Sequence, residues 1–192
     1  MIRKKLSQIA KLVNGYAFKS TKYVDSGIRI IRIANVQDGY ISDEFPCFYP
    51  MDCLSYLGDS LLKENDLLMS LTGNVGRVAI LKKELLPAAL NQRVECIRPN
   101  DGISKEYLYH FFKSQKFKLE AVKNSTGCAQ LNMSTNWLGN YEIPIYDQKA
   151  TQEINKCLNE IEKVIETGKK QLALLEELIK SRFVRQEASL CC

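Results

Sequence analysis

Residues 154–179 read INKCLNEIEKVIETGKKQLALLEELI, and the spacing of the apolar residues in this stretch decides the fold of the C-terminal part. Successive apolar positions are separated by alternating steps of four and three residues, with Gly168 standing at one of them. This heptad spacing predicts a long helix whose apolar stripe faces a partner helix, as in a coiled coil. The stripe consists of Ile154, Leu158, Ile161, Ile165, Leu172, Leu175 and Ile179.

We expect this helix to cover residues 147–187, a length of roughly 60 Å at ~1.5 Å per residue. It would follow a globular part, residues 1–146, and precede a short tail, residues 188–192. An unpaired apolar stripe of this length would be an exposed hydrophobic patch, so pairing with another helix is favoured. The alternative is that the stripe packs back on its own globular part. Gly168, where a large apolar residue is expected, predicts a bend or a close helix crossing.

Length and composition narrow the class of protein. A chain of 192 residues fits one domain with an extension, and no apolar run is long enough to span a membrane. The basic N-terminus, with Arg3, Lys4 and Lys5, lacks the apolar core of a signal peptide. The seven cysteines form no CxxC pair, which argues against a disulfide framework or a zinc site and favours the reducing cytoplasm.

The globular part mixes strand and helix signals. β-Branched runs and turn residues predict strands, including a hairpin joined by a glycine-rich loop, and Ser104 is placed to cap a helix. The whole is therefore expected to be an α/β (α+β) domain followed by one long C-terminal helix. The expected elements are a short helical turn over 7–12, strands over 28–33, 67–71, 77–81 and 94–97, a helix over 104–122 and an extended segment over 141–145.

The net charge of +5 is unevenly distributed along the chain. Residues 147–192 carry eight basic and eight acidic side chains, so the whole excess lies in residues 1–146. A basic globular part attached to a neutral helix indicates an anionic partner, most simply nucleic acid. The alternative is a surface that is basic without a partner.

Signs of an enzyme are few. The one histidine, His110, lies on the aromatic face of an expected helix, where packing explains it better than catalysis. The loop Thr72–Gly76 joins two strands and lacks the lysine and the following helix of a phosphate-binding loop. Asp147 and Lys149 have the residue types of a nuclease motif, but an aspartate at a helix start is explained by capping. We therefore expect no catalytic residues, no metal and no cofactor.

Four polar loops carry the side chains that read DNA bases and hold phosphates. Arginine pairs bidentately with guanine and asparagine or glutamine with adenine, each worth ~1–3 kcal/mol of discrimination. For any one residue, the alternative to DNA contact is that it lies in a solvent-exposed loop or forms a turn. As a set, the loops favour DNA binding. The candidate residues are Lys19, Ser20, Thr21 and Lys22 in the first loop, Thr72, Asn74 and Arg77 in the second, Asn91, Gln92 and Arg93 in the third, and Asn124, Ser125, Gln130 and Asn132 in the fourth.

An ordered set of short motifs resembles the specificity subunit of type I restriction–modification systems, more narrowly one half of that subunit. No single motif is specific, but their order and spacing hold over nearly the whole chain. They are Gly15–Phe18, Ile33–Val36 with Gly39, Gly58–Leu62, Asp66–Leu68, Gly73 and Gly76, Asn91–Val94, Gly127–Leu131, Ile143–Ile145, Gln148 and Ile154.

The resemblance implies a target-recognition domain over residues 1–146 and a spacer helix over residues 147–187. Members of the family carry two such units, which read the two halves of a split site in double-stranded DNA. The paired helices fix the gap between those halves. The resemblance also implies binding to DNA methyltransferase (modification) subunits, joined by the restriction motor subunit, and no catalytic residues in the chain itself.

This chain departs from the family in holding one unit where two are usual. A homodimer would restore the missing half, and a two-fold dimer would read a palindromic split site. If the chain is a truncated form, the second half need not be the same. A different reading is a coiled-coil interaction or decoy protein that binds methyltransferase subunits and never touches DNA. A nuclease built on Asp147 and Lys149 is a third.

Overall fold

The computed structural model describes residues 1–127 and 129–190, with the backbone alone for residues 182–190. The chain divides into two units, Met1–Asp147 and Gln148–Cys192. The first unit contains the sheets and the shorter helices, and the second contains the long helix α6. Residues 188–190 of the expected tail belong to α6, while Cys191 and Cys192 lie outside the described residues.

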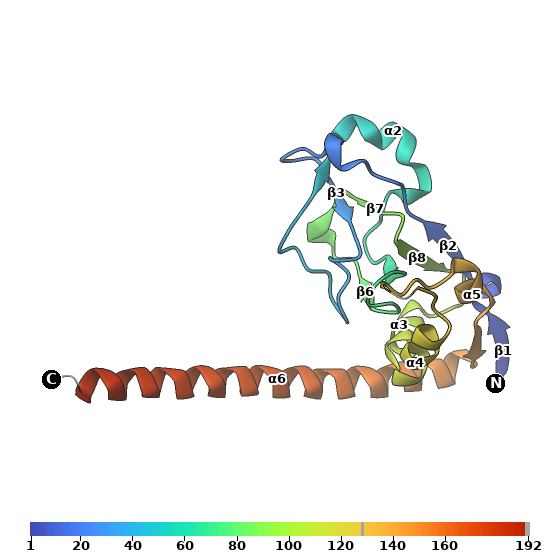
Figure 1. Ribbon diagram of the computed structural model, residues 1–192. Helices are drawn as coiled ribbons and strands as arrows, with labels where there is room; N and C mark the ends of the chain where they lie inside the picture. The colour runs from blue at the N-terminus through green and yellow to red at the C-terminus, as the bar shows by residue number, and fades with distance from the viewer. Residues whose placement is uncertain (128, 191–192) are drawn as a thin grey trace. The chain divides into compact units, whose positions relative to one another are not determined.

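A four-stranded antiparallel sheet carries the core of the first unit, in the order β2-β8-β5-β6 (Figure 1). Every residue of β5 is buried, so apolar side chains cover both faces of this strand. β5 and β6 form the expected hairpin, with Met69 opposite Val78. Gly73 and Gly76 in the connection have φ of +75° and +78°, a backbone region that favours glycine. The strands are β2 (Ala10–Asn14), β5 (Leu67–Ser70), β6 (Val78–Ile80) and β8 (Val94–Pro99).

A second sheet, in the order β4-β3-β7, lies with α2 at one end of the first unit (Figure 1). β3 pairs with β7 in parallel and with β4 antiparallel. The strand expected over 28–33 ends at Ile31, because the backbone then turns, with the Asn35 N–H donating to the Arg32 carbonyl. The elements here are η1 (Ser20–Lys22), β3 (Ile28–Ile31), β4 (Phe48–Tyr49), η2 (Met51–Cys53), α2 (Leu54–Leu57), η3 (Gly58–Ser60), η4 (Lys83–Leu85) and β7 (Ala88–Leu90).

The two ends of the first unit meet in a two-stranded sheet of β1 (Ile2–Lys5) and β9 (Glu142–Ile145), which covers the segment expected to be extended. Helix α1 (Leu6–Ile9) follows β1 directly. The expected helical turn through Leu12 was too long. The chain leaves the helix at Ala10, because β2 pairs with β8 in the central sheet.

The helix expected over 104–122 is two helices, α3 (Lys105–Lys113) and α4 (Gln115–Lys123). Ser104 caps the first as predicted, with its Oγ accepting from the Tyr107 N–H at 3.1 Å. Ser114 breaks the run, because its backbone is extended and its Oγ accepts from the Phe117 N–H at 3.3 Å. A second N-cap therefore competes with helix continuation at this residue. A third helix, α5 (Thr135–Asn140), follows the polar loop after α4.

Helix α6 spans Gln148–Leu190, close to the expected range, and is about 65 Å long at ~1.5 Å per residue. It continues through Gly168, which has open space where a side chain would stand. Its apolar stripe is exposed from Ile161 onward, at 50–59% of each side chain. The exposed members are Ile161, Ile165, Leu172, Leu175 and Ile179.

Ile154 and Leu158, nearer the start of α6, are half-buried. Among the described residues, no helix is both long enough and apolar enough to cross a bilayer.

Candidate nucleic-acid interface

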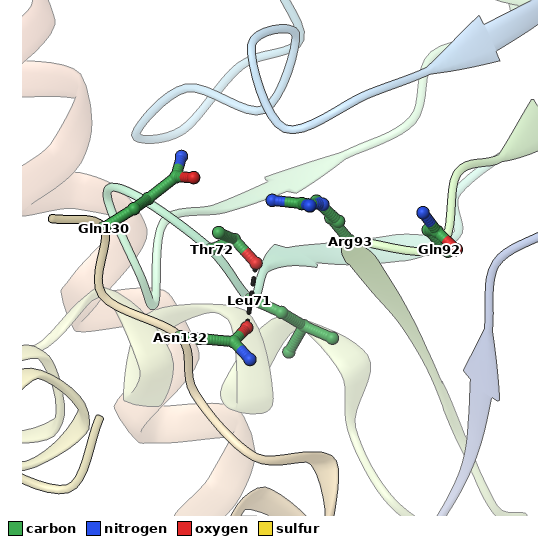
Figure 2. A pocket seen from close by; sticks show the side chains of 6 residues that line it. All are labelled: Leu71, Thr72, Gln92, Arg93, Gln130 and Asn132. Atoms are coloured by element: carbon green, nitrogen blue, oxygen red, sulfur yellow. Dashed lines mark hydrogen bonds between the residues drawn. The ribbon is translucent and has the colours of Figure 1, made fainter. Parts of the chain in front are cut away.

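Three of the four predicted polar loops meet around one pocket of about 330 Å³ in the first unit. Its floor is buried and its rim is exposed. The loop after β5 supplies the floor, while the loop before β8 and the loop after α4 supply the rim (Figure 2). Five of the predicted DNA-binding residues therefore come together. The lining residues are Leu71, Thr72, Gln92, Arg93, Gln130 and Asn132.

Backbone hydrogen bonds hold the three loops in this arrangement. The Leu71 N–H donates to the Arg93 carbonyl at 3.0 Å, and the Leu71 carbonyl accepts from the Met133 N–H at 2.7 Å. The Gly73 N–H donates to the Leu131 carbonyl at 2.8 Å. Residues far apart in the sequence are thus fixed by main-chain contacts, which do not depend on the identity of the rim side chains. Such a scaffold can carry different rim residues without refolding.

One side-chain hydrogen bond fixes the centre of the pocket. The Thr72 Oγ1 donates to the Asn132 Oδ1 at 2.9 Å. This bond orients the Asn132 amide, so that its NH₂ group is directed away from the threonine (Figure 2). Arg93 and Gln130 extend toward one another beside this pair, and Gln92 lies farther along the rim (Figure 2). The pocket therefore presents hydrogen-bond donors and acceptors together with one positive charge.

The other two residues of the second loop, Asn74 and Arg77, line a neighbouring pocket of about 430 Å³. The Arg77 Nη1 donates to the Gln37 Oε1 at 2.7 Å. The Lys118 Nζ makes an ion pair with the Asp38 Oδ2 at 2.7 Å across the same pocket. Both cations are therefore engaged by the protein itself, which makes this pocket a weaker candidate for phosphate or base contact.

Several predicted residues have local structural roles. The Asn124 Nδ2 donates to the Glu120 carbonyl at 2.8 Å, and the Ser125 Oγ donates to the Ala121 carbonyl at 2.7 Å, so both bind the last turn of α4. The Asn91 Oδ1 accepts from the Arg93 N–H at 3.4 Å. The first loop lies in and beside η1, and its exposed side chains line neither of the two pockets. These are Lys19, Ser20, Thr21 and Lys22.

The residues predicted from the sequence do not include several that line these two pockets. Leu71 was assigned to a strand, yet it forms part of the first floor. Asp38 and Lys118 come from segments 80 residues apart and meet at the second pocket. No local pattern could have paired them. Leu119 and Val122 beside Lys118 are exposed, so this side of α4 is not fully covered.

One buried carboxyl group lies in the central sheet, directly after the rim loop of Arg93. Glu95 is fully buried in β8, where it stands opposite Met69 and Asn14. Neither of its carboxyl oxygens has a hydrogen-bond partner among the described residues. Burial raises the pKa of Glu95 to about 7, because the charged form loses its hydration.

In the described part of the chain, no three His, Cys, Asp or Glu side chains gather into a group that could bind a metal ion.

The ion pair of Arg98 with Asp66 is structural, with two hydrogen bonds at 3.0 and 2.7 Å. Arg98 also donates to the Leu61 carbonyl at 2.9 Å. It therefore joins β8 to the segment that precedes β5.

Curated proteins of known class match most of this chain. The MjaVIII type I restriction enzyme specificity subunit of Methanocaldococcus jannaschii is 29% identical over 181 residues, 92% of this chain and 43% of that subunit. The EcoAI type I restriction enzyme specificity subunit of Escherichia coli is 29% identical over 171 residues, 86% of this chain and 28% of that subunit. The chain thus spans less than half the length of these relatives.

Solved structures share the fold. A chain from a study of complex assembly and conformational transition of the type I R-M system superposes with a TM-score of 0.72 at 17% identity, covering 93% of this chain and 42% of that one. The HsdS subunit from Thermoanaerobacter tengcongensis gives a TM-score of 0.66 at 17% identity, covering 86% and 38%.

The family match extends over both units. Residues 3–177 match the family described as the type I restriction modification DNA specificity domain. The matched range contains the polar loops, the central sheet and most of α6. This chain therefore belongs to the type I restriction–modification DNA specificity domain family.

Proposed function

We propose that residues 1–146 are a target-recognition domain that reads one half of a split site in double-stranded DNA. The observation that carries this proposal is the convergence of Thr72, Gln92, Arg93, Gln130 and Asn132 around one open polar pocket. These residue types pair with base edges, and the domain that holds them carries the entire positive excess of the chain. Family membership supports the same function.

The chain acts in this proposal as a non-catalytic scaffold in the cytoplasm. It positions DNA methyltransferase subunits, and the restriction motor subunit joins that complex. Helix α6 is the spacer, and its exposed apolar stripe pairs with the same stripe of a second copy. Leaving five large apolar residues half exposed along one helix face is unfavourable in water, which supports such pairing. The homodimer then carries two identical reading domains.

The test is the pattern of methylation that the chain directs. The chain is expressed with its methyltransferase subunits, and methylated bases are mapped on random-sequence DNA. We expect one split motif with a fixed gap, and a homodimer makes its two halves identical in inverted orientation. Methylation without a motif, or none at all, contradicts sequence reading.

The same experiment separates a second candidate function. A coiled-coil decoy that binds methyltransferase subunits without touching DNA is favoured by the exposed stripe of α6 alone. It predicts a complex with the methyltransferase that protects no DNA. An asymmetric motif would retain DNA reading but exclude the homodimer.

A further inference from the structure

The pocket at Thr72 and Asn132 has the chemistry of a base-pair reader and not that of a phosphate site. A phosphate offers only acceptors and is met by donors such as Lys, Arg and backbone N–H groups. Here Arg93 is the one charged side chain among six lining residues. The others at the rim are amides, which carry both a donor and an acceptor. A surface with donors and acceptors side by side matches the major-groove edge of a base pair.

Arg93 differs from the four arginines in or beside the two larger sheets. Arg29 binds Asp43, Arg77 binds Gln37 and Arg98 binds Asp66. Arg32 donates to the Phe45 carbonyl. The Arg93 guanidinium has no hydrogen-bond acceptor among the described residues, although its backbone is held by Leu71. Its fork of donors is thus available at the rim of an open pocket.

We propose that Arg93 reads the O6 and N7 atoms of a guanine, while the Gln130 amide oxygen accepts from the N4 amine of the paired cytosine. This inference rests on the proposed DNA-reading function and names the base pair that the pocket takes. The two guanine acceptors lie side by side, as the guanidinium fork requires. The cytosine amine is a donor and needs an acceptor beside the arginine, which Gln130 supplies. Figure 2 shows the two side chains directed toward one another.

The position of Gln130 is constrained from two sides by glycine. A Cβ on Gly73 would lie 3.3 Å from the Gln130 Nε2, and a Cβ on Gly127 would lie 2.3 Å from the Gln130 carbonyl oxygen. Both glycines have φ in the left-handed region, at +75° and +111°. The loop thus brings Gln130 over the pocket by a path that larger residues would block. Preorganisation of this kind reduces the entropy lost on binding.

The experiment uses the full chain in complex with its methyltransferase subunits. Bound sites are selected from a random DNA pool and sequenced for the parent and for Arg93→Lys, which keeps the charge but loses the planar fork. We expect Arg93→Lys to lose about tenfold in preference for guanine at one position of each half-site, with the other positions unchanged. Gln130→Ala should weaken discrimination at the same base pair.

The matched control is Arg3→Lys, the same substitution at an exposed arginine in β1 outside both pockets. It should leave the motif unchanged, and thermal unfolding of each variant verifies folding. If Arg93→Lys keeps every position of the motif, the proposal is overturned. A uniform loss of affinity in Arg93→Ala, with the salt slope reduced by about one, would also overturn it by identifying a phosphate contact. A parent chain that selects no motif overturns this inference together with the proposed function.

Discussion

At the residue scale, Glu95 is expected to make the stability of the fold depend on pH. Its pKa is raised to about 7 in the folded chain from an ordinary value of 4.5. Between these two values the folded chain keeps a proton that the unfolded chain has released. The free energy of unfolding should therefore fall as pH rises from about 4.5 to 7, by roughly 3 kcal/mol, and the contribution should be constant above that window.

Glu95→Gln tests this prediction, because the amide has the same shape and does not titrate. Urea unfolding at a series of pH values should show a smaller decline between pH 5 and 7 for this variant than for the parent. At pH 8 the variant should be the more stable of the two. Glu64→Gln, at an exposed position, is the control and should follow the parent. Equal pH dependence in all three proteins would show that Glu95 is not protonated in the folded state.

At the scale of elements, the sequence predicted the helices and hairpins that form through interactions between residues close together in the chain. The β5–β6 hairpin follows from apolar runs around Gly73 and Gly76, and α6 follows from its heptad spacing. The prediction of one helix was wrong at Ser114, because a serine can cap a new helix as well as stand within a helix, and the apolar pattern does not distinguish the two. β1 was not predicted at all, since its polar residues acquire strand geometry only through pairing with β9.

The candidate site, like the fold, could be predicted only in part from the sequence. The sequence identified the residue types, but not which loops meet. Thr72 and Asn132 are joined by a hydrogen bond across 60 residues of chain, and the loops around them are held by main-chain contacts. Such long-range pairing depends on the strand order of the central sheet. The first loop, Lys19–Lys22, could be set apart from the pocket only after that order was known.

A charge placed in the apolar stripe of α6 should abolish self-association. Leu172→Glu introduces a carboxylate where the proposed dimer buries an apolar side chain, and burying an unpaired charge is strongly unfavourable. Sedimentation velocity should show a monomer for this variant. Lys170→Glu changes a charge in the same turn but outside the stripe and should remain dimeric. If Leu172→Glu sediments like the parent, the stripe is not the dimer interface.

The order of the stripe also predicts the direction of pairing. Its spacing reads the same in both directions around a point between Ile165 and Gly168. In an antiparallel pair, Ile165 of one copy therefore faces the open space at Gly168 of the other, and Ile161 faces Leu172. A parallel pair would place Gly168 against Gly168 and leave a void, which costs stability.

Disulfide formation distinguishes the two directions. With Cys157, Cys191 and Cys192 replaced by serine, Ile161→Cys and Leu172→Cys are made in separate chains. Mixed and oxidised, the two chains should join to each other, because residues 161 and 172 share a layer in the antiparallel pair. Each chain oxidised alone should remain unlinked. Links between two Ile161→Cys chains would instead demonstrate parallel pairing.

At the scale of the whole molecule, the net positive charge lies in the globular part and not in the helix, so the two parts are expected to respond differently to salt. Residues 1–146 carry the +5 excess, and residues 147–192 are neutral overall. Salt should therefore weaken DNA binding through the first unit and leave helix pairing nearly unchanged, since apolar burial is not screened. A change in salt concentration therefore tests DNA binding and helix pairing separately.

DNA binding by the complex should decrease linearly in a plot of log affinity against log salt, because each neutralised phosphate releases counterions and contributes about −0.9 to the slope. The complex with methyltransferase is measured on its motif and on unrelated DNA between 50 and 300 mM salt, with the methyltransferase alone as the reference. Adding the chain should steepen the slope, and Lys19→Ala with Lys22→Ala should reduce it by about two if both contact phosphate. Sedimentation across the same salt range should give a constant dimer. A slope equal to that of the methyltransferase alone would mean that the basic domain does not contact the DNA backbone.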